Sequence, residues 1–168
     1  AHYYDPHHPH ETVEEFEKKF DLKYDAEIAF VDQQIGRLRK AVEKATNGNR
    51  VIWIIVADHG EGFGEHQEQK HGLFIWDSVM KIPFIIADTE NQLGKVKSDL
   101  VVSNVDVLPT ALGLAGITSP PSIDGKDLSG IFEGKSITRE PIYMEATLPQ
   151  IRFGYHPEVG AVHDKFKL

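Results

Sequence analysis

The sequence predicts an α/β fold, with a mostly parallel sheet that is flanked by helices. Residues 51–57 and 82–87 are two apolar runs, rich in β-branched side chains and without alternating polar residues. Such runs are typical of strands covered on both faces, as in parallel sheets. A helical pattern precedes the first run, as expected for a helix that packs on a sheet.

The helix ahead of the first run is predicted by apolar residues that recur at spacings of three and four. Asp21 and Asp25 suit its N-terminal end and Lys44 suits its C-terminal end, because these charges complement the helix dipole. Asn47 and Gly48 form a stop signal. The apolar residues that share one face are Ile28, Val31, Ile35, Leu38 and Val42.

A second helix and a hairpin are expected in the second half of the chain. The helix covers Ser103–Ala115, with Pro109 in its first turn or at a kink. Asp106 lies near its start, where a carboxylate usually caps the helix or makes a structural hydrogen bond. The other expected elements are a surface crossing at 118–141, a short strand at 142–145, and a hairpin at 159–168 that turns near His163 and Asp164.

The composition fits one globular domain and excludes several classes of protein. The chain has 168 residues, 40% of them hydrophobic, and a net charge of −8, which argues against a general nucleic-acid binder. No apolar run approaches the ~18 residues of a membrane span, and the first ten residues show no signal-peptide pattern. Without Cys, the chain itself has no disulfide, Cys-ligated zinc or Cys nucleophile. Compartment and oligomeric state stay open.

The stretch most suited to chemistry follows the first strand directly and reads Asp-His-Gly-Glu-Gly-Phe-Gly-Glu-His, from Asp58 to His66. Ligands in open α/β sheets bind at the carboxyl ends of strands, where Asp58 and His59 would lie. An oxygen and a nitrogen ligand suit several divalent metals. The spacing alone leaves a metal site and a polar surface loop equally open. Glu61 and Glu65 are candidate general bases, although solvation in the loop is their more usual role.

Two further groups of residues suit an anion. Lys70 and His71 could both reach an anion that is held at the metal. Near the N-terminus, His7 belongs to a His-x-Pro segment, and the first ten residues of the chain contain four His. Considered alone, these groups are more typical of a solvated lysine, a loop histidine and a flexible terminus.

The combination of these motifs resembles the second half of a sulfatase of the alkaline phosphatase superfamily. The resemblance covers nearly the whole chain, with several motifs in the family's order. It is carried by the residues at 56–66, 70–72, 76–77 and 81–86, by the His-x-Pro segment at 5–9, by the helix at 27–36, and by the segments at 105–117 and 124–128. It implies an alkaline-phosphatase-like fold, incomplete in this chain, with a small antiparallel hairpin at its C-terminal end.

The resemblance also implies roles for individual residues. Asp58 and His59 match the positions that bind the divalent metal, usually Ca²⁺, with Mg²⁺, Mn²⁺ and Zn²⁺ as alternatives. His7 and His71 match catalytic residues that contact the sulfuryl oxygens, with His2 as a weaker competitor for the role of His7. Lys70, next to His71, would also bind the substrate.

The family's nucleophile is missing from the sequence. Sulfatases use a formylglycine made from the first residue of a Cys/Ser-x-Pro-x-Arg motif, and no Ser or Cys here begins such a motif. The paired aspartates that complete the metal site also have no counterpart. We therefore expect residues 1–168 to be the C-terminal portion of a single catalytic domain, whose partner is the missing N-terminal half.

Three functions follow from the resemblance. In the first, the chain is part of a sulfatase that hydrolyses sulfate esters with a divalent metal and an upstream formylglycine. In the second, the chain is part of a phosphodiesterase or phosphonate monoester hydrolase of the same superfamily, whose substrate would be a phosphate ester. The third is a non-catalytic metal-binding fragment, and we expect the 168 residues alone to be inactive. The family favours a periplasmic or secreted location.

Overall fold

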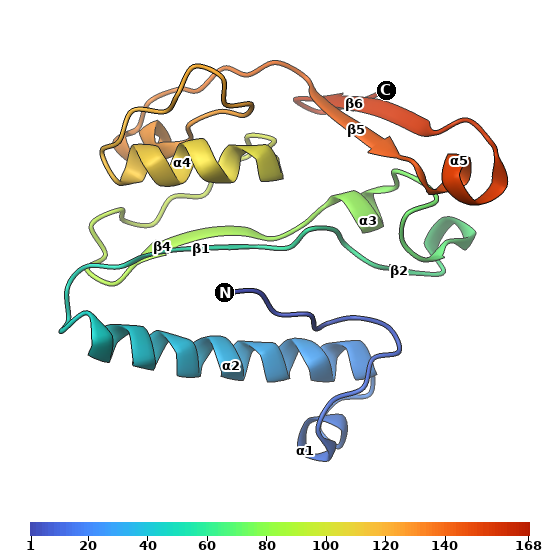
Figure 1. Cartoon of the computed structure of the whole chain (residues 1–168), viewed down its shortest axis with the longest axis horizontal. Helices are drawn as coiled ribbons and strands as arrows, with labels where there is room; N and C mark the ends of the chain where they lie inside the picture. Colours follow the sequence, from blue (N-terminus) through green and yellow to red (C-terminus); the bar gives the residue numbers. More distant parts are fainter. The chain divides into compact units, whose positions relative to one another are not determined.

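A computed structural model describes all residues from Ala1 to Leu168. The chain forms two compact units, Ala1–Val51 and Ile52–Leu168. Helices and strands are mixed along the chain (Figure 1). None of the helices combines the length and the apolar character that crossing a membrane requires.

The first unit consists of the His-rich N-terminal segment and two helices, α1 (Glu14–Glu17) and α2 (Lys23–Ala45). Helix α2 confirms the predicted long helix, with Asp25 in its first turn and Lys44 in its last. The helix ends at the expected signal. The N–H of Gly48, at φ +77°, donates to the carbonyl oxygen of Glu43 at 3.1 Å, which satisfies one of the last carbonyls of the helix.

Two strands of the second unit, β1 (Ile52–Val56) and β4 (Phe84–Asp88), confirm the two predicted strands. They lie side by side (Figure 1) and pair antiparallel, with Ile52 opposite Asp88 and Val56 opposite Phe84. The parallel pairing expected within this part of the chain is therefore wrong. Apolar strands also occur in antiparallel pairs, so an apolar run alone does not determine strand direction.

The expected burial of β1 on both faces is also wrong within this chain. The residues of β1 are half-buried, and its last residue, Val56, is exposed. In addition, β1 and β4 pair only with each other. A two-stranded sheet leaves one edge of each strand without a strand neighbour.

The predicted second helix is confirmed as a 3₁₀ turn, η2 (Asn104–Asp106), that continues into α4 (Val107–Leu114). Pro109 lies in the first turn of α4, where its missing N–H costs no helical hydrogen bond. The crossing that follows is mostly exposed, as expected, and contains the 3₁₀ helix η3 (Ser129–Glu133).

The C-terminal part forms a three-stranded antiparallel sheet in the order β5-β6-β7. Strand β5 (Ile142–Ala146) confirms the predicted strand, and β6 (Glu158–His163) with β7 (Phe166–Lys167) confirms the hairpin. A short helix that the sequence pattern did not predict, α5 (Leu148–Phe153), connects β5 to β6. The small core under this sheet consists of Ile75, Met144 and Ala146, with Met80 and Val162 packed against it.

The Gly-rich stretch after β1 folds into short elements. They are a two-stranded antiparallel ribbon of β2 (Gly62–Phe63) and β3 (Gln69–Lys70), the 3₁₀ helix η1 (Glu65–Gln67) between them, and the helix α3 (Asp77–Met80). Asp58 and His59 precede this ribbon, Lys70 lies in it, and His71 follows it.

Candidate functional site

Asp58 lies just beyond the C-terminal end of β1, where its backbone is fixed and its side chain is open. The side-chain amide of Asn104 donates to the carbonyl oxygens of Ala57 and Asp58, at 3.2 Å each. The Asp58 carboxylate accepts the N–H of His59 at 3.0 Å, yet its side chain is 84% exposed. Most of this carboxylate is therefore accessible to a ligand from solution.

The contacts of His59 show which of its ring nitrogens carries the proton and which one lies near the Asp58 carboxylate. Its Nδ1 lies 2.7 Å from the carbonyl oxygen of Gly60. Because a carbonyl oxygen only accepts, Nδ1 carries the proton and Nε2 of the neutral ring holds the lone pair. Nε2 lies 3.8 Å from Asp58 Oδ2. Metal-binding histidines commonly donate their second N–H to a backbone carbonyl in this way.

The two residues fit part of a metal site. An oxygen and an imidazole nitrogen at one strand end are ligands that several divalent ions accept. The chain contains no group of three or more His, Cys, Asp or Glu side chains placed to hold a metal ion. Since zinc takes about four ligands and calcium about six to eight, further ligands would have to come from elsewhere.

His71 lies against His59 and against a buried carboxylate. In the β2–β3 ribbon Gly62 is opposite Lys70, so the next pair in the same register is Glu61 opposite His71. His71 Nδ1 lies 3.1 Å from Glu61 Oε1, and the centroids of the His59 and His71 rings are 3.8 Å apart. The structure thus brings Asp58, His59 and His71 together.

The expectation that Glu61 is solvated in the loop is wrong. Its side chain is only 7% exposed, because the ribbon turns it inward against His71. Glu65 remains exposed, as expected for a loop residue. The N–H of Phe63 donates to Glu65 Oε2 at 2.7 Å and lowers the pKa of this carboxyl below its usual value.

Glu68 is a residue of this site that the sequence reasoning missed. It is buried, and its Oε1 accepts the N–H groups of Leu73 at 3.0 Å and Phe74 at 3.3 Å. These bonds close the loop that carries Lys70 and His71. A Glu in a polar, Gly-rich stretch gives no sequence signal of burial.

Lys70 is exposed at the end of β3 and has a left-handed backbone with φ +100°. Non-glycine residues rarely adopt this conformation unless neighbouring structure imposes it. Its carbonyl oxygen packs on Gly62, where an added Cβ would come within 2.7 Å. The position of Lys70 therefore depends on a glycine in the facing strand.

His7 belongs to the first unit, where the N-terminal segment is anchored. Its Nδ1 lies 2.6 Å from the carbonyl oxygen of His8, and its Nε2 lies 3.2 Å from the hydroxyl of Tyr4. The backbone N–H of His7 donates to Glu27 Oε2 at 3.2 Å, and His10 Nδ1 lies 2.8 Å from the same oxygen. Glu27 is buried on α2. Its bonds anchor the His-x-Pro segment, for which a flexible terminus was the alternative to an anion-binding role.

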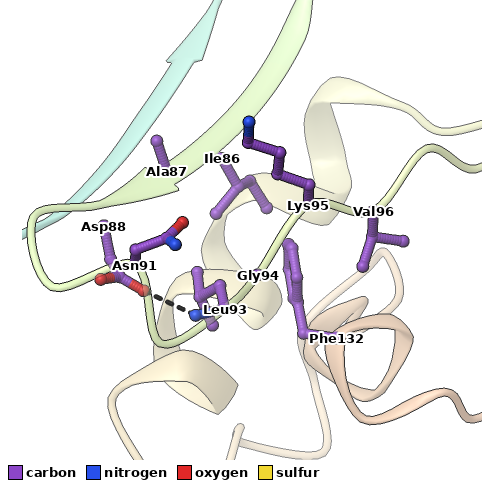
Figure 2. Close-up of a pocket in the computed structure, with 9 residues that line it drawn as sticks. All are labelled: Ile86, Ala87, Asp88, Asn91, Leu93, Gly94, Lys95, Val96 and Phe132. Carbon is purple, nitrogen blue, oxygen red and sulfur yellow. Dashed lines mark hydrogen bonds between the residues drawn. The ribbon is translucent and has the colours of Figure 1, made fainter.

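A shallow pocket in the second unit lies away from these residues (Figure 2). It has a volume of about 300 Å³ and is formed by the end of β4, the turn that follows it, and Phe132. Because β1 and β4 are antiparallel, it lies at the opposite end of the hairpin from Asp58. Its carboxylate, Asp88, already accepts the N–H groups of Glu90, Gln92 and Leu93. The pocket contains none of the predicted site residues.

A family model described as Sulfatase matches residues 1–117 of the chain. The chain belongs to the sulfatase family. This confirms the resemblance seen in the sequence. The match includes the His-x-Pro segment, the β2–β3 ribbon and the strands β1 and β4.

Individual sulfatases agree with the family assignment. The chain is 34% identical to the uncharacterized sulfatase YidJ of Escherichia coli (strain K12), over 83% of this chain and 27% of that protein. It is 33% identical to an arylsulfatase of Clostridium perfringens, over 72% of this chain and 26% of that protein. The chain spans about a quarter of the length of these relatives.

The crystal structure of a putative sulfatase from Bacteroides thetaiotaomicron has the same fold over 86% of this chain and 32% of its own, with a TM-score of 0.68 and 23% identity. This confirms the alkaline-phosphatase-like α/β fold. Sulfatases in general use a divalent metal.

Proposed function

We propose that this chain is part of a sulfatase that hydrolyses sulfate esters, in which Asp58 and His59 bind the divalent metal. The observation that carries the proposal is the arrangement at the end of β1. There an 84% exposed carboxylate lies next to an imidazole whose Nε2 holds a lone pair, and the His71 ring lies 3.8 Å from that imidazole.

The roles of the side chains follow from their chemistry. When bound, the metal would supply Lewis-acid polarisation of a sulfuryl oxygen. Nδ1 of His71 is directed at Glu61. As an imidazolium, His71 would therefore donate a hydrogen bond from Nε2 to the sulfuryl group of the substrate. Lys70 is the proposed second cation for the substrate. The role of His7 stays a prediction from the family resemblance.

The proposal names Ca²⁺ as the metal, on the basis of the family. The nitrogen of His59 is the observation that favours an alternative, since Ca²⁺ prefers oxygen ligands whereas Mn²⁺ and Zn²⁺ also accept imidazole. This alternative goes with the second candidate function, a phosphodiesterase or phosphonate monoester hydrolase. Elemental analysis of the purified protein distinguishes Ca²⁺ from Mn²⁺ and Zn²⁺.

The proposed nucleophile is a formylglycine on a segment that this sequence does not contain. No Cys is present, and no Ser begins a Ser-x-Pro-x-Arg motif. The chain spans only about a quarter of the length of its curated relatives. This supports a nucleophile that lies on another segment of the protein. For the same reason we propose that the 168 residues bind metal only weakly and turn over no substrate by themselves.

The test compares the protein expressed from the complete coding sequence with the 168-residue chain. Each is assayed with an aryl sulfate and with the matched aryl phosphodiester, before and after metal removal. We expect metal-dependent hydrolysis of the aryl sulfate by the complete protein and none by the chain alone. Faster hydrolysis of the phosphodiester would support the second candidate, and turnover by the chain alone would contradict the placement of the nucleophile.

A further inference from the structure

Glu61 has a position that its expected role as a solvated loop residue does not explain. Its carboxylate is nearly buried, and Oε1 lies 3.1 Å from Nδ1 of His71. A carboxylate only accepts hydrogen bonds, so Nδ1 of His71 must carry a proton for this contact to be favourable. Glu61 therefore determines which ring nitrogen of His71 remains for other partners.

The backbone around Glu61 is held tightly on both sides. The N–H of Gly60 donates to the carbonyl oxygen of Val79 at 2.8 Å, and a Cβ at Gly60 would lie 2.2 Å from the carbonyl oxygen of Ser78. A Cβ at Gly62 would lie 2.7 Å from the carbonyl oxygen of Lys70. Only glycine fits these two positions, so the backbone approaches α3 and β3 closely and Glu61 has little freedom to move.

The loop that carries His71 is fixed as well. Glu68 bonds the N–H groups of Leu73 and Phe74, which closes the chain after His71. Glu61 acts on the imidazole ring, whereas Glu68 acts on the backbone. A change at Glu61 should thus alter the orientation and tautomer of the ring without opening the loop.

We propose that Glu61 is a positioning residue for His71, which holds Nδ1 so that Nε2 meets the anion. The proposal rests on the proposed function for the role of His71, and Glu61 itself contacts no substrate. Without this bond the ring is free to rotate, and the Nε2 N–H of the imidazolium proposed above would no longer point at the sulfuryl oxygens.

The kinetic test uses the protein expressed from the complete coding sequence, with an aryl sulfate as substrate. Glu61→Leu removes the acceptor and should lower kcat/KM by about 10–100-fold, as removal of orienting partners of histidines does elsewhere. Bound metal should not change. Glu61→Gln keeps an oxygen that can accept the same N–H, so it should recover most of the loss. Glu140→Gln, at an exposed carboxylate outside the site, is the matched control and should keep wild-type kcat/KM.

The spectroscopic test uses the same complete protein and needs no activity. Long-range ¹⁵N–¹H spectra at about pH 8.5, above the ordinary histidine pKa of about 6.5, report which nitrogen of His71 carries the proton. His71→Gln assigns the signal. We expect the proton on Nδ1 in the wild type and in Glu61→Gln, and a shift towards Nε2 in Glu61→Leu.

Three results would overturn the proposal. They are an unchanged kcat/KM in Glu61→Leu, an unchanged tautomer in that variant, and a loss of bound metal from it. A loss in Glu61→Gln as large as that in Glu61→Leu would also count against a hydrogen-bonding role. If the wild-type protein hydrolyses no sulfate ester, the proposed function fails, and the spectra still test the contact between Glu61 and His71.

Discussion

Two aspartates of the second unit, Asp106 and Asp58, illustrate how a carboxylate serves structure or chemistry. Asp106 is completely buried and accepts hydrogen bonds from the N–H groups of Ser103 at 2.7 Å and Lys126 at 2.8 Å. Arg139 Nη1 lies 2.6 Å from its Oδ2. Asp58 is 84% exposed and accepts only a bond from its own neighbour, at 3.0 Å. The saturated carboxylate organises the fold, and the open one suits a metal.

The largest expected effect is on activity, at Asp58. Asp58→Ala should abolish sulfate ester hydrolysis by the protein expressed from the complete coding sequence, because the metal loses its carboxylate ligand. The free energy of unfolding should change by no more than about 0.5 kcal/mol, as is usual for exposed sites. An aryl sulfate assay and urea unfolding measure both quantities. Wild-type activity in this variant would end the assignment of Asp58 as a ligand.

The opposite result is expected at Asp106. Asp106→Ala leaves the guanidinium of Arg139 buried without its partner, which typically costs about 3–5 kcal/mol of stability. Urea unfolding of the 168-residue chain measures this loss. The control is the double variant Asp106→Ala/Arg139→Met, which should recover part of the loss because the unpaired charge is gone. A loss below about 1 kcal/mol would contradict the structural role of the pair.

His71 tests the anion contact separately from the metal. His71→Ala should lower kcat by about 10²–10³-fold, the usual effect of removing one donor to a developing anion. Metal content, measured by elemental analysis, should be unchanged. If the variant also lost its metal, His71 would belong with Asp58 and His59 as a ligand.

The smallest expected effect concerns Asp77, which links α3 to β7. Lys81 at 2.8 Å and Lys167 at 3.0 Å lower the pKa of Asp77 below its usual value of 3.8. The stabilisation is therefore fully present above about pH 4 and is lost as the pH falls through the lowered pKa. Since the side chain is 57% exposed, screening limits the effect to a few tenths of a kcal/mol. Asp77→Asn should reduce stability at pH 7 by this amount, and its effect should diminish as the pH falls below about 4, as judged by urea unfolding.

Much of the fold follows from local patterns in the sequence. The apolar spacing and the end charges predict α2, and Asn47 with Gly48 predicts its end. The structural role expected for Asp106 near a helix start is confirmed by its bonds to Ser103 and Lys126. The helix and its end depend on residues close together in the sequence, and the role of Asp106 depends on a carboxylate at a helix start. Both kinds of pattern can be recognised in the sequence.

The features that the sequence did not predict depend on partners far along the chain. The antiparallel pairing of β1 and β4 was missed because an apolar run does not encode direction. The burial of Glu61 and Glu68 was missed because it depends on the register of the β2–β3 ribbon, which only three-dimensional structure defines. A two-stranded ribbon within a polar stretch lacks the alternation that marks longer strands.

The most direct test of the proposed site is the metal content of the protein expressed from the complete coding sequence, compared between wild type, Asp58→Ala and Asp106→Asn after removal of free metal. We predict one equivalent of a divalent ion in the wild type and in the folded fraction of Asp106→Asn, and a large loss in Asp58→Ala. Equal metal content in wild type and Asp58→Ala would contradict a metal site at the end of β1.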